Sequence, residues 1–124
     1  METQRLIMQV SNYYQVLIGL KKSKDADALA QRLMKIDGGA MTLNSLAWNG
    51  YLTGTPTETN LDQARKANDL SKGKDAAIID TLARILKARD KKEEAVKLVK
   101  DAMEQLTKPY EKRVLDECLK AMEE

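Results

Sequence analysis

Residues 79–102 read IDTLARILKARDKKEEAVKLVKDA, and this stretch decides the fold. Its apolar residues recur at steps of three and four on either side of the charged run at 89–94. This is the spacing of two amphipathic helices joined by a short turn. Antiparallel helices approach closely where small side chains meet, so we expect Ala83 to face Ala95 while larger residues fill the gaps. The inward residues of this hairpin are Ile79, Leu82, Ala83, Leu86, Ala95, Val99 and Ala102.

An earlier segment, LNSLAW at 43–48, repeats part of this pattern. Leu46-Ala47 in this segment occupies the same position as Leu82-Ala83 in the stretch at 79–102. This correspondence predicts an internal repeat. The turn of the first copy, at about 53–59, contains Gly54 and is longer than that of the second. We therefore expect a first hairpin with a lengthened turn, followed by a second, more regular one.

The first forty residues predict one further helical hairpin. Its first helix is expected at about 2–21, and its second begins at a cap provided by Ser23 or Asp25 and ends at Gly38-Gly39. The apolar stripe expected to be buried on the first helix is Leu6, Val10, Tyr13, Leu17 and Leu20.

Polar residues mark where the later helices begin. A third helix is expected at about 40–53, and a fourth stops near Gly73. Asp75 caps a fifth at about 76–89, and a sixth follows at about 91–107. Two pairs have the pattern of a capping box, in which each side chain bonds the other's backbone: Asn60 with Gln63 for the fourth helix, and Asp90 with Glu93 for the sixth.

The last helix is expected to close the open end of the stack. Pro109 suits its first turn, where the missing N–H has no helical partner. A terminal helix of this kind covers an apolar face that would otherwise meet water. Deletion of residues 110–124 is therefore expected to cause unfolding or association. The apolar side of this helix consists of Val114, Leu115, Cys118, Leu119 and Met122.

The predicted fold is thus an all-α domain of about seven helices. We divide its 124 residues into a divergent hairpin at 1–39, a repeat with a lengthened turn at 40–73, the clearest repeat at 74–108, and a capping helix at 109–124. A chain of this length can bury a core without disulfides or metals. With no Phe, its core must be built from Leu, Ile, Ala and Met, which favours helices over strands.

Composition excludes several classes of function. The chain has no His and one Cys, so an internal disulfide, a Cys/His zinc site and a His-containing triad are all excluded. Its 21 basic and 19 acidic residues are too evenly balanced to predict nucleic-acid binding from bulk charge. No apolar run is long enough to insert into a membrane. We expect no enzyme activity, no cofactor and no metal, in a soluble protein that is cytoplasmic or, as a fragment of a longer bacterial protein, exported.

The stretch at 79–102 resembles the tetratricopeptide repeat family. The family pattern W-x2-L-G-x2-Y followed by A-x3-F is matched with smaller apolar residues by Ile79-x2-Leu82-Ala83-x2-Leu86 and Ala95-x3-Val99. The earlier copy matches less closely, because Asn68 stands where the pattern prefers an aromatic residue. The resemblance implies a right-handed stack of antiparallel helical hairpins, a superhelix that acts as a scaffold for binding proteins.

The resemblance also implies where a partner would bind. In this family the first helix of each pair lines a concave face, which can hold a peptide or protein segment. The basic clamp by which some members hold a chaperone's C-terminal carboxylate is not matched, since Trp48 and Asp80 occupy two of its positions. The partner-binding residues implied here are Asn44, Trp48, Tyr51, Asp80, Arg84 and Lys87.

A second family resemblance leads to an alternative function. A Leu-Ala-Trp helix, a lengthened turn and an Asp-Thr-Leu-Ala helix also resemble the helical tail behind thioredoxin-like domains in some bacterial redox proteins. Such a tail would position substrate or mediate self-association as a homo-oligomer. Because no Cys-x-x-Cys occurs here, the redox chemistry would lie outside this chain.

Three candidate residues each have a structural alternative. Trp48 is either a binding hot spot or a packing residue whose indole N–H is accepted by Asp80. Asp80 either binds a ligand or complements the helix dipole. Cys118 lies at helical spacing among apolar residues, which favours a buried, inert thiol over a nucleophile. The basic residues around 87–92 alternate with acids and favour a solvated turn over a phosphate site.

Overall fold

The computed structural model describes residues 5, 8–9, 12–14, 16–17, 20–36 and 38–124. Residues outside these ranges, including Leu6 and Val10 of the first predicted stripe, lie outside the described residues. The all-α fold with about seven helices is confirmed, and no strand occurs within the described ranges. The described residues before 18 are helical, and the helices that follow are α2 (Ser23–Ile36), α3 (Ala40–Leu52), α4 (Glu58–Leu70), α5 (Ala76–Ala88), α6 (Lys92–Gln105) and α7 (Pro109–Glu123).

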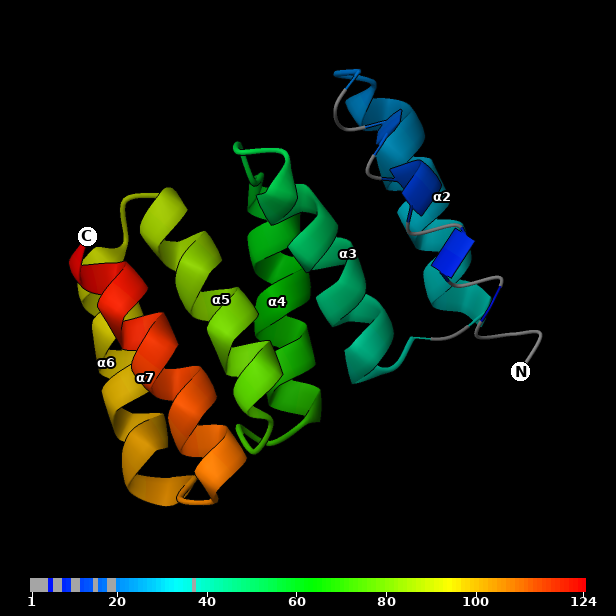
Figure 1. Ribbon diagram of the computed structural model, residues 1–124. Helices are drawn as coiled ribbons and strands as arrows, with labels where there is room; N and C mark the ends of the chain where they lie inside the picture. The colour runs from blue at the N-terminus through cyan, green and yellow to red at the C-terminus, as the bar shows by residue number, and fades with distance from the viewer. Residues whose placement is uncertain (1–4, 6–7, 10–11, 15, 18–19, 37) are drawn as a thin grey trace.

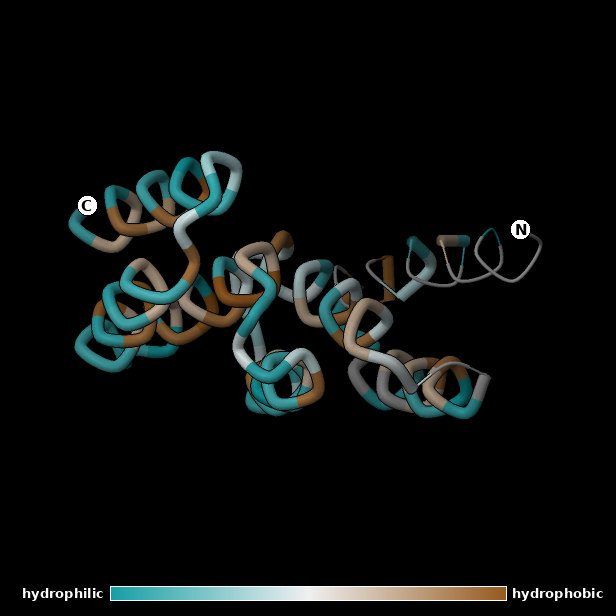
Figure 2. Tube along the Cα trace, turned by 90° about the horizontal axis from the view of Figure 1, so that it is seen from below, coloured by the Kyte–Doolittle hydropathy of each residue, from teal (hydrophilic) through white to brown (hydrophobic). Residues whose placement is uncertain are grey.

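The helices stand side by side in a row of antiparallel pairs (Figure 1). Helix α3 pairs with α4, α5 pairs with α6, and α4 packs against α5 to join the two hairpins. Helix α7 then packs on both α5 and α6, as expected of a capping helix. Viewed along the helices, α4 and α7 lie on opposite sides of α3 and α5 (Figure 2).

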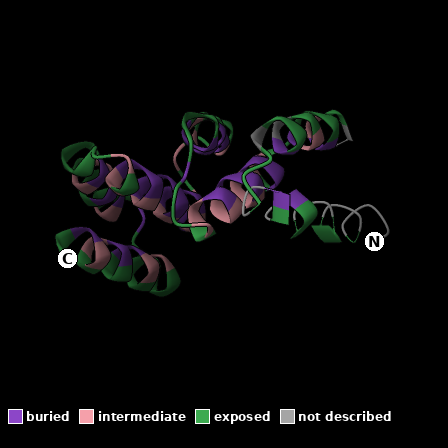
Figure 3. Ribbon diagram, turned by 90° about the horizontal axis from the view of Figure 1, so that it is seen from above, coloured by how far each residue is buried: buried purple, intermediate pink, exposed green. Residues whose placement is uncertain are grey.

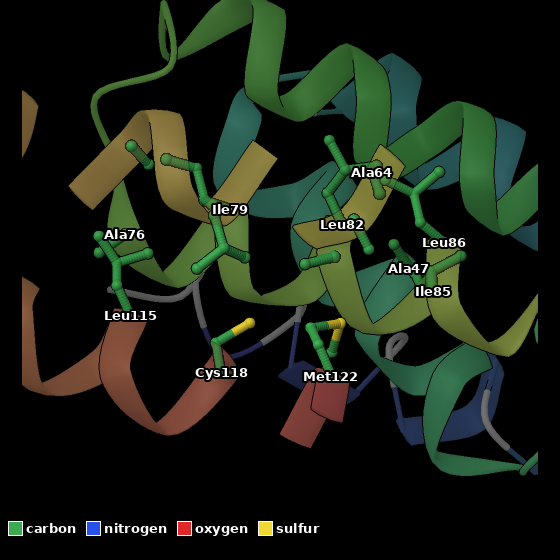
Figure 4. Packing of buried hydrophobic residues seen from close by; sticks show 14 of the residues in the cluster. Ala47, Ala64, Ala76, Ile79, Leu82, Ile85, Leu86, Leu115, Cys118 and Met122 are labelled. Atoms are coloured by element: carbon green, nitrogen blue, oxygen red, sulfur yellow. The ribbon is translucent and has the colours of Figure 1, made fainter. Parts of the chain in front are cut away.

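The main core lies between α5, α6 and α7, and all seven inward residues predicted from 79–102 are buried in it. Ala83 and Ala95 are fully buried in the same cluster, as the close-packing argument requires. The capping helix contributes Leu115, Cys118 and Met122, which point toward α5 (Figure 4). Buried residues fill the middle of the stack and exposed ones its outer sides (Figure 3).

Helix starts agree with the predicted caps at α5 and α7 and differ at α2, α4 and α6. Helix α2 already begins at Ser23, so the predicted cap at Ser23 or Asp25 is wrong: both residues lie inside the first turn. Asp75 caps α5 by accepting from the backbone N–H of Ala77 at 2.9 Å, and Pro109 opens α7. The capping box of α4 consists of Thr57 and Asn60, so the predicted box of Asn60 with Gln63 is wrong by three residues.

The predicted capping box of Asp90 with Glu93 is also wrong. Asp90 has a φ of 63°, in the left-handed region, whereas an N-cap residue needs an extended backbone. The N–H of the next residue, Lys91, bonds back to the carbonyl of Leu86 at 2.8 Å. Asp90 therefore ends α5 as a left-handed C-terminal cap, and α6 begins without a side-chain cap.

The predicted stripe of the N-terminal segment is wrong at two of its described positions. Tyr13 and Leu20 are 58% and 61% exposed, whereas Leu17 is buried as expected. Tyr14 is buried in place of Tyr13, since its hydroxyl accepts a hydrogen bond of 2.9 Å from the side chain of Asn60. A tertiary polar contact thus decides which tyrosine turns inward.

Gly50 is a point of close approach between α3 and α4. A Cβ added at this residue would lie 2.2 Å from Oδ1 of Asn60, a separation that no real Cβ contact shows. The Asn60 side chain is held there by bonds with Thr57, Gln63 and Tyr14. The hairpin therefore depends on a missing side chain on one helix and a fixed buried amide on the other.

Ion pairs join helices that are distant in sequence. Arg65 on α4 donates to both carboxylate oxygens of Glu94 on α6, at 2.9 and 3.0 Å. Arg89, after α5, donates to the Pro56 carbonyl at 3.1 Å and to Glu58 at 2.8 Å. The lengthened turn before α4 is thereby attached to the end of α5.

The Arg65–Glu94 pair predicts a dependence of stability on pH. The hydrogen bond from Arg65 lowers the pKa of Glu94 from its ordinary value of 4.5. A carboxylate with a depressed folded-state pKa stabilises the fold above its unfolded pKa, and this contribution is lost as pH falls through the folded pKa. Because both side chains are exposed to solvent, the effect is expected to be small.

Glu94→Gln removes this contribution. We expect the variant to melt below the wild type at pH 7, and the difference in Tm to vanish as pH falls below the folded pKa of Glu94. Thermal melts followed by circular dichroism between pH 7 and pH 2.5 measure it. A Tm difference that stays constant over this range would contradict the assignment.

Candidate functional site

Helix α3 is the one helix among α2–α7 that carries no charged residue. Its sequence is AMTLNSLAWNGYL, in a chain of which 32% is charged. One face is buried against α4 and α5, and its residues are Thr42, Leu43, Leu46, Ala47 and Gly50. A surface helix ordinarily presents charged residues on the opposite face, and α3 does not.

The opposite face of α3 carries no charge, and on it exposed apolar residues alternate with the partly buried polar residues Asn44, Ser45 and Asn49. Met41 is 61% exposed and Leu52 is 51% exposed, with the partly buried Trp48 and Tyr51 between them along the helix. Met41 and Leu52 are three turns apart, which spans about 16 Å. We call Met41, Trp48, Tyr51 and Leu52 the α3 face. Exposed apolar residues gathered on one side of a helix are a candidate interaction surface.

Trp48 and Tyr51 form an aromatic pair within this face. Their ring centroids are 5.1 Å apart and their planes differ by 27°. Among the described residues, the structure shows no hydrogen bond from the Trp48 indole N–H to Asp80, whose Oδ1 accepts from Arg84, although Trp48 is partly buried as the packing alternative expects. A stacked pair is rigid, so an aromatic surface is presented at little further cost in conformational entropy.

The predicted residues of α5 lie beside this pair but mostly bond within the chain. Nε of Arg84 donates to Asp80 at 2.8 Å, and both side chains are partly buried. Burial opposes the charge of Arg84, but hydrogen bonds with Asp80 and Tyr51 outweigh it, so the pKa of the guanidinium is raised. Tyr51, Arg84 and Asp80 thus link α3 to α5, and the charges of α5 form the flank of the α3 face.

Lys87 and Asn44 complete the six predicted residues. Nζ of Lys87 donates to the backbone carbonyl of Ala121 at 2.5 Å, which attaches α5 to α7. Asn44 is partly buried one turn before Trp48, and its Oδ1 is buried without a hydrogen-bond partner among the described residues. The structure therefore places the partly buried aromatic residues at the centre of the α3 face and Lys87 in a contact between helices.

Met41 and Leu52 are the residues of this face that the sequence interpretation missed. Their spacing fits a buried helix position as well as an exposed one, so periodicity alone does not separate the two. The absence of charge over 40–52 is the signal that could have identified them. A surface helix without charged residues departs from the usual amphipathic pattern and is a candidate for a face that a partner covers.

Cys118 lies beneath Asp80, on α7. It is fully buried, and burial together with a hydrogen bond to the Asp80 carboxylate raises the pKa of the thiol to about 12. The nucleophile of a thiol is its thiolate form. At pH 8 the thiolate population is therefore very small.

We expect Cys118 to resist a thiol reagent in the folded protein. At pH 8 its labelling should be roughly a thousandfold slower than in the unfolded chain, because both thiolate and access are lost. Absorbance of a disulfide-exchange reagent, with and without guanidinium, measures the two rates. Lys112→Cys, exposed on the same helix, should label at once. Rapid native labelling of Cys118 would show that the thiol is reachable and ionised.

Within the described ranges, no group of three or more His, Cys, Asp or Glu residues is placed to hold a metal ion. None of the helices so described is long and apolar enough to cross a membrane. Comparisons with protein-family models, curated proteins and solved structures found no match to this chain.

Proposed function

We propose that this chain is a non-enzymatic scaffold that binds a peptide or protein segment along the α3 face. One observation carries the proposal: α3 has no charge and leaves Met41 and Leu52 more than half exposed. Leaving such surface in water costs about 25 cal/mol for each Å² that a partner would cover. The stacked aromatic pair at its centre is of the residue type that dominates interface energetics.

The α5 residues beside the α3 face are expected to orient a bound segment more than to increase its affinity. Asp80 and Arg84 neutralise each other, and partly exposed pairs of this kind contribute little net binding energy. A segment lying on the α3 face would bring its polar side against this pair. The partner's apolar residues are therefore expected to contact α3 and its polar residues to contact α5.

The proposal is tested by placing charge on the α3 face. The double variant Met41→Glu and Leu52→Glu changes only exposed positions, so it should remain helical and monomeric. A matched control adds the same charge at Gln105→Glu, the exposed last residue of α6, and at Thr107→Glu, which is exposed just after the helix. Each protein is immobilised and exposed to cell extract, and the retained proteins are compared by quantitative mass spectrometry with isotope labelling.

We expect at least one protein to be retained equally by the wild type and the control, and about tenfold less by the α3 variant. That loss corresponds to roughly 1.4 kcal/mol, which is within the range for one interfacial hot spot. The proposal fails if the three proteins retain the same set in the same amounts. Specific retention of a second copy of this chain would show that the α3 face mediates self-association and not binding of a different protein.

A further inference from the structure

At one inward position the first repeat has a polar residue, Asn68, where the second has Val99, and a pocket lies beside Asn68. Asn68 on α4 and Val99 on α6 occupy equivalent positions in the two repeats. Each lies four residues after the inward alanine of its helix, Ala64 or Ala95. Val99 is fully buried in the core, whereas Asn68 is only partly buried. A cavity of about 230 Å³ lies beside Asn68, between α4, α5 and α6.

The inner wall of this cavity is apolar and its rim is charged. Leu82 and Leu86 of α5 and Leu98 of α6 line it together with Asn68. Arg65, Asp69 and Glu94 complete the lining, and the Arg65–Glu94 pair connects the two helices that flank it. This pocket is about half open to solvent, and its volume is sufficient for a phenyl ring with a short chain.

Two acceptors in the lining have no partner among the described residues. Oδ1 of Asn68 is buried and makes no hydrogen bond, and the carboxylate of Asp69 makes no ion pair there. The terminal torsion of Asn is soft, so the amide can turn its oxygen to a donor in the cavity. Since Arg65 and Glu94 neutralise each other, the charge that remains on the lining is negative.

We propose that this cavity binds a small organic amine, with its apolar body against the leucines and its ammonium group donating to Asn68 and Asp69. The amine is cationic at neutral pH, and its N–H groups supply the donors that the lining lacks. This site is independent of the α3 face, because it is formed by α4, α5 and α6.

The probe is 2-phenylethylamine, compared with 2-phenylethanol and phenylacetate, which share its ring and chain length. Binding is followed by the methyl resonances of Leu82, Leu86 and Leu98 in the full chain labelled at leucine methyl groups. We expect saturable shifts of these three residues with the amine, about tenfold weaker binding of the alcohol, and none of the carboxylate. Equal binding of amine and alcohol, or no saturable shift, would overturn the proposal.

Two variants separate the contributions of shape and charge. Asp69→Asn keeps the shape and should weaken amine binding by about threefold, as expected for an exposed charge. Asn68→Leu should fill the cavity, abolish binding and raise Tm, because it also removes an unpaired amide. Met41→Glu should leave amine binding unchanged, which keeps this test distinct from that of the α3 face. Amine binding that survives Asn68→Leu would place it elsewhere and contradict the assignment.

Discussion

Deletion of residues 110–124 is expected to abolish the cooperative fold of the remaining chain. Helix α7 buries Leu115, Cys118 and Met122 against α5 and α6. Burial of a side chain of this kind contributes about 1.5 to 3 kcal/mol, so the three together contribute roughly 5 kcal/mol or more. This loss is comparable with the whole stability of a small domain, which is about 5 to 15 kcal/mol.

Circular dichroism and light scattering measure the outcome. The truncated chain should lose its sigmoidal melting transition, or associate through the uncovered face of α6. Leu115→Ala gives a graded version and should cost about 3 kcal/mol, whereas Glu117→Ala, exposed on the same helix, should cost almost nothing. A monomeric, fully helical truncation that melts cooperatively would show that α7 is not part of the core.

Gly50→Ala is expected to destabilise the protein by about 2 to 3 kcal/mol. The added methyl group would occupy the space of the Asn60 amide, which is fixed by hydrogen bonds to Thr57, Gln63 and Tyr14. Overpacking costs about 1 to 3 kcal/mol, and displacing a buried amide from its partners costs about as much again. Alanine's better helix propensity returns only about 1 kcal/mol.

Two controls identify the cause of this loss. Gly54→Ala introduces the same methyl group in open space but at a φ of 88°, so it should cost about 1 kcal/mol through backbone strain alone. In the double variant Gly50→Ala plus Asn60→Ala, the clash is gone. The measured loss of stability should therefore be smaller than the sum of the losses in the two single variants. Urea denaturation gives each value. If Gly50→Ala costs no more than Gly54→Ala, the close approach of α3 and α4 is wrong.

The part of the fold that the sequence predicted well is the part set by helical periodicity. Ala83, Ala95 and Val99 are buried because a period of 3.6 and small residues at the crossing leave one arrangement that packs. The third, fifth and sixth helices were placed within two residues of their observed ends. These features depend on residues close together in sequence.

What the sequence did not predict depends on contacts between distant residues. Thr57-x-x-Asn60 and Asn60-x-x-Gln63 are equally good capping patterns locally, and the place of Asn60 beneath Gly50 and beside Tyr14 selects the first. In the same way, Asp90 has the residue type of an N-cap but adopts the conformation that ends α5. Local pattern supplies the candidates, and tertiary packing chooses among them.

The sequence identified some residues of the candidate site and missed others, because the local pattern does not specify contacts between distant helices. Trp48 and Tyr51 were identified as aromatic residues on the first helix of a repeat, and they do lie together. Lys87 was expected to meet a partner, yet it bonds the carbonyl of Ala121 on a helix that follows much later in the chain. Exposure of Met41 and Leu52 depends on which face of α3 the neighbouring helices cover, and that is a property of the stack.

Site-specific photo-crosslinking in living cells tests the central claim, that the α3 face holds a protein partner. A photoreactive phenylalanine derivative is placed at Met41 or Leu52, and for comparison at Lys100 on the exposed side of α6. We predict a discrete crosslinked product with one protein from positions 41 and 52 and none from position 100. No discrete product from either α3 position, or the same product from all three, would contradict the account.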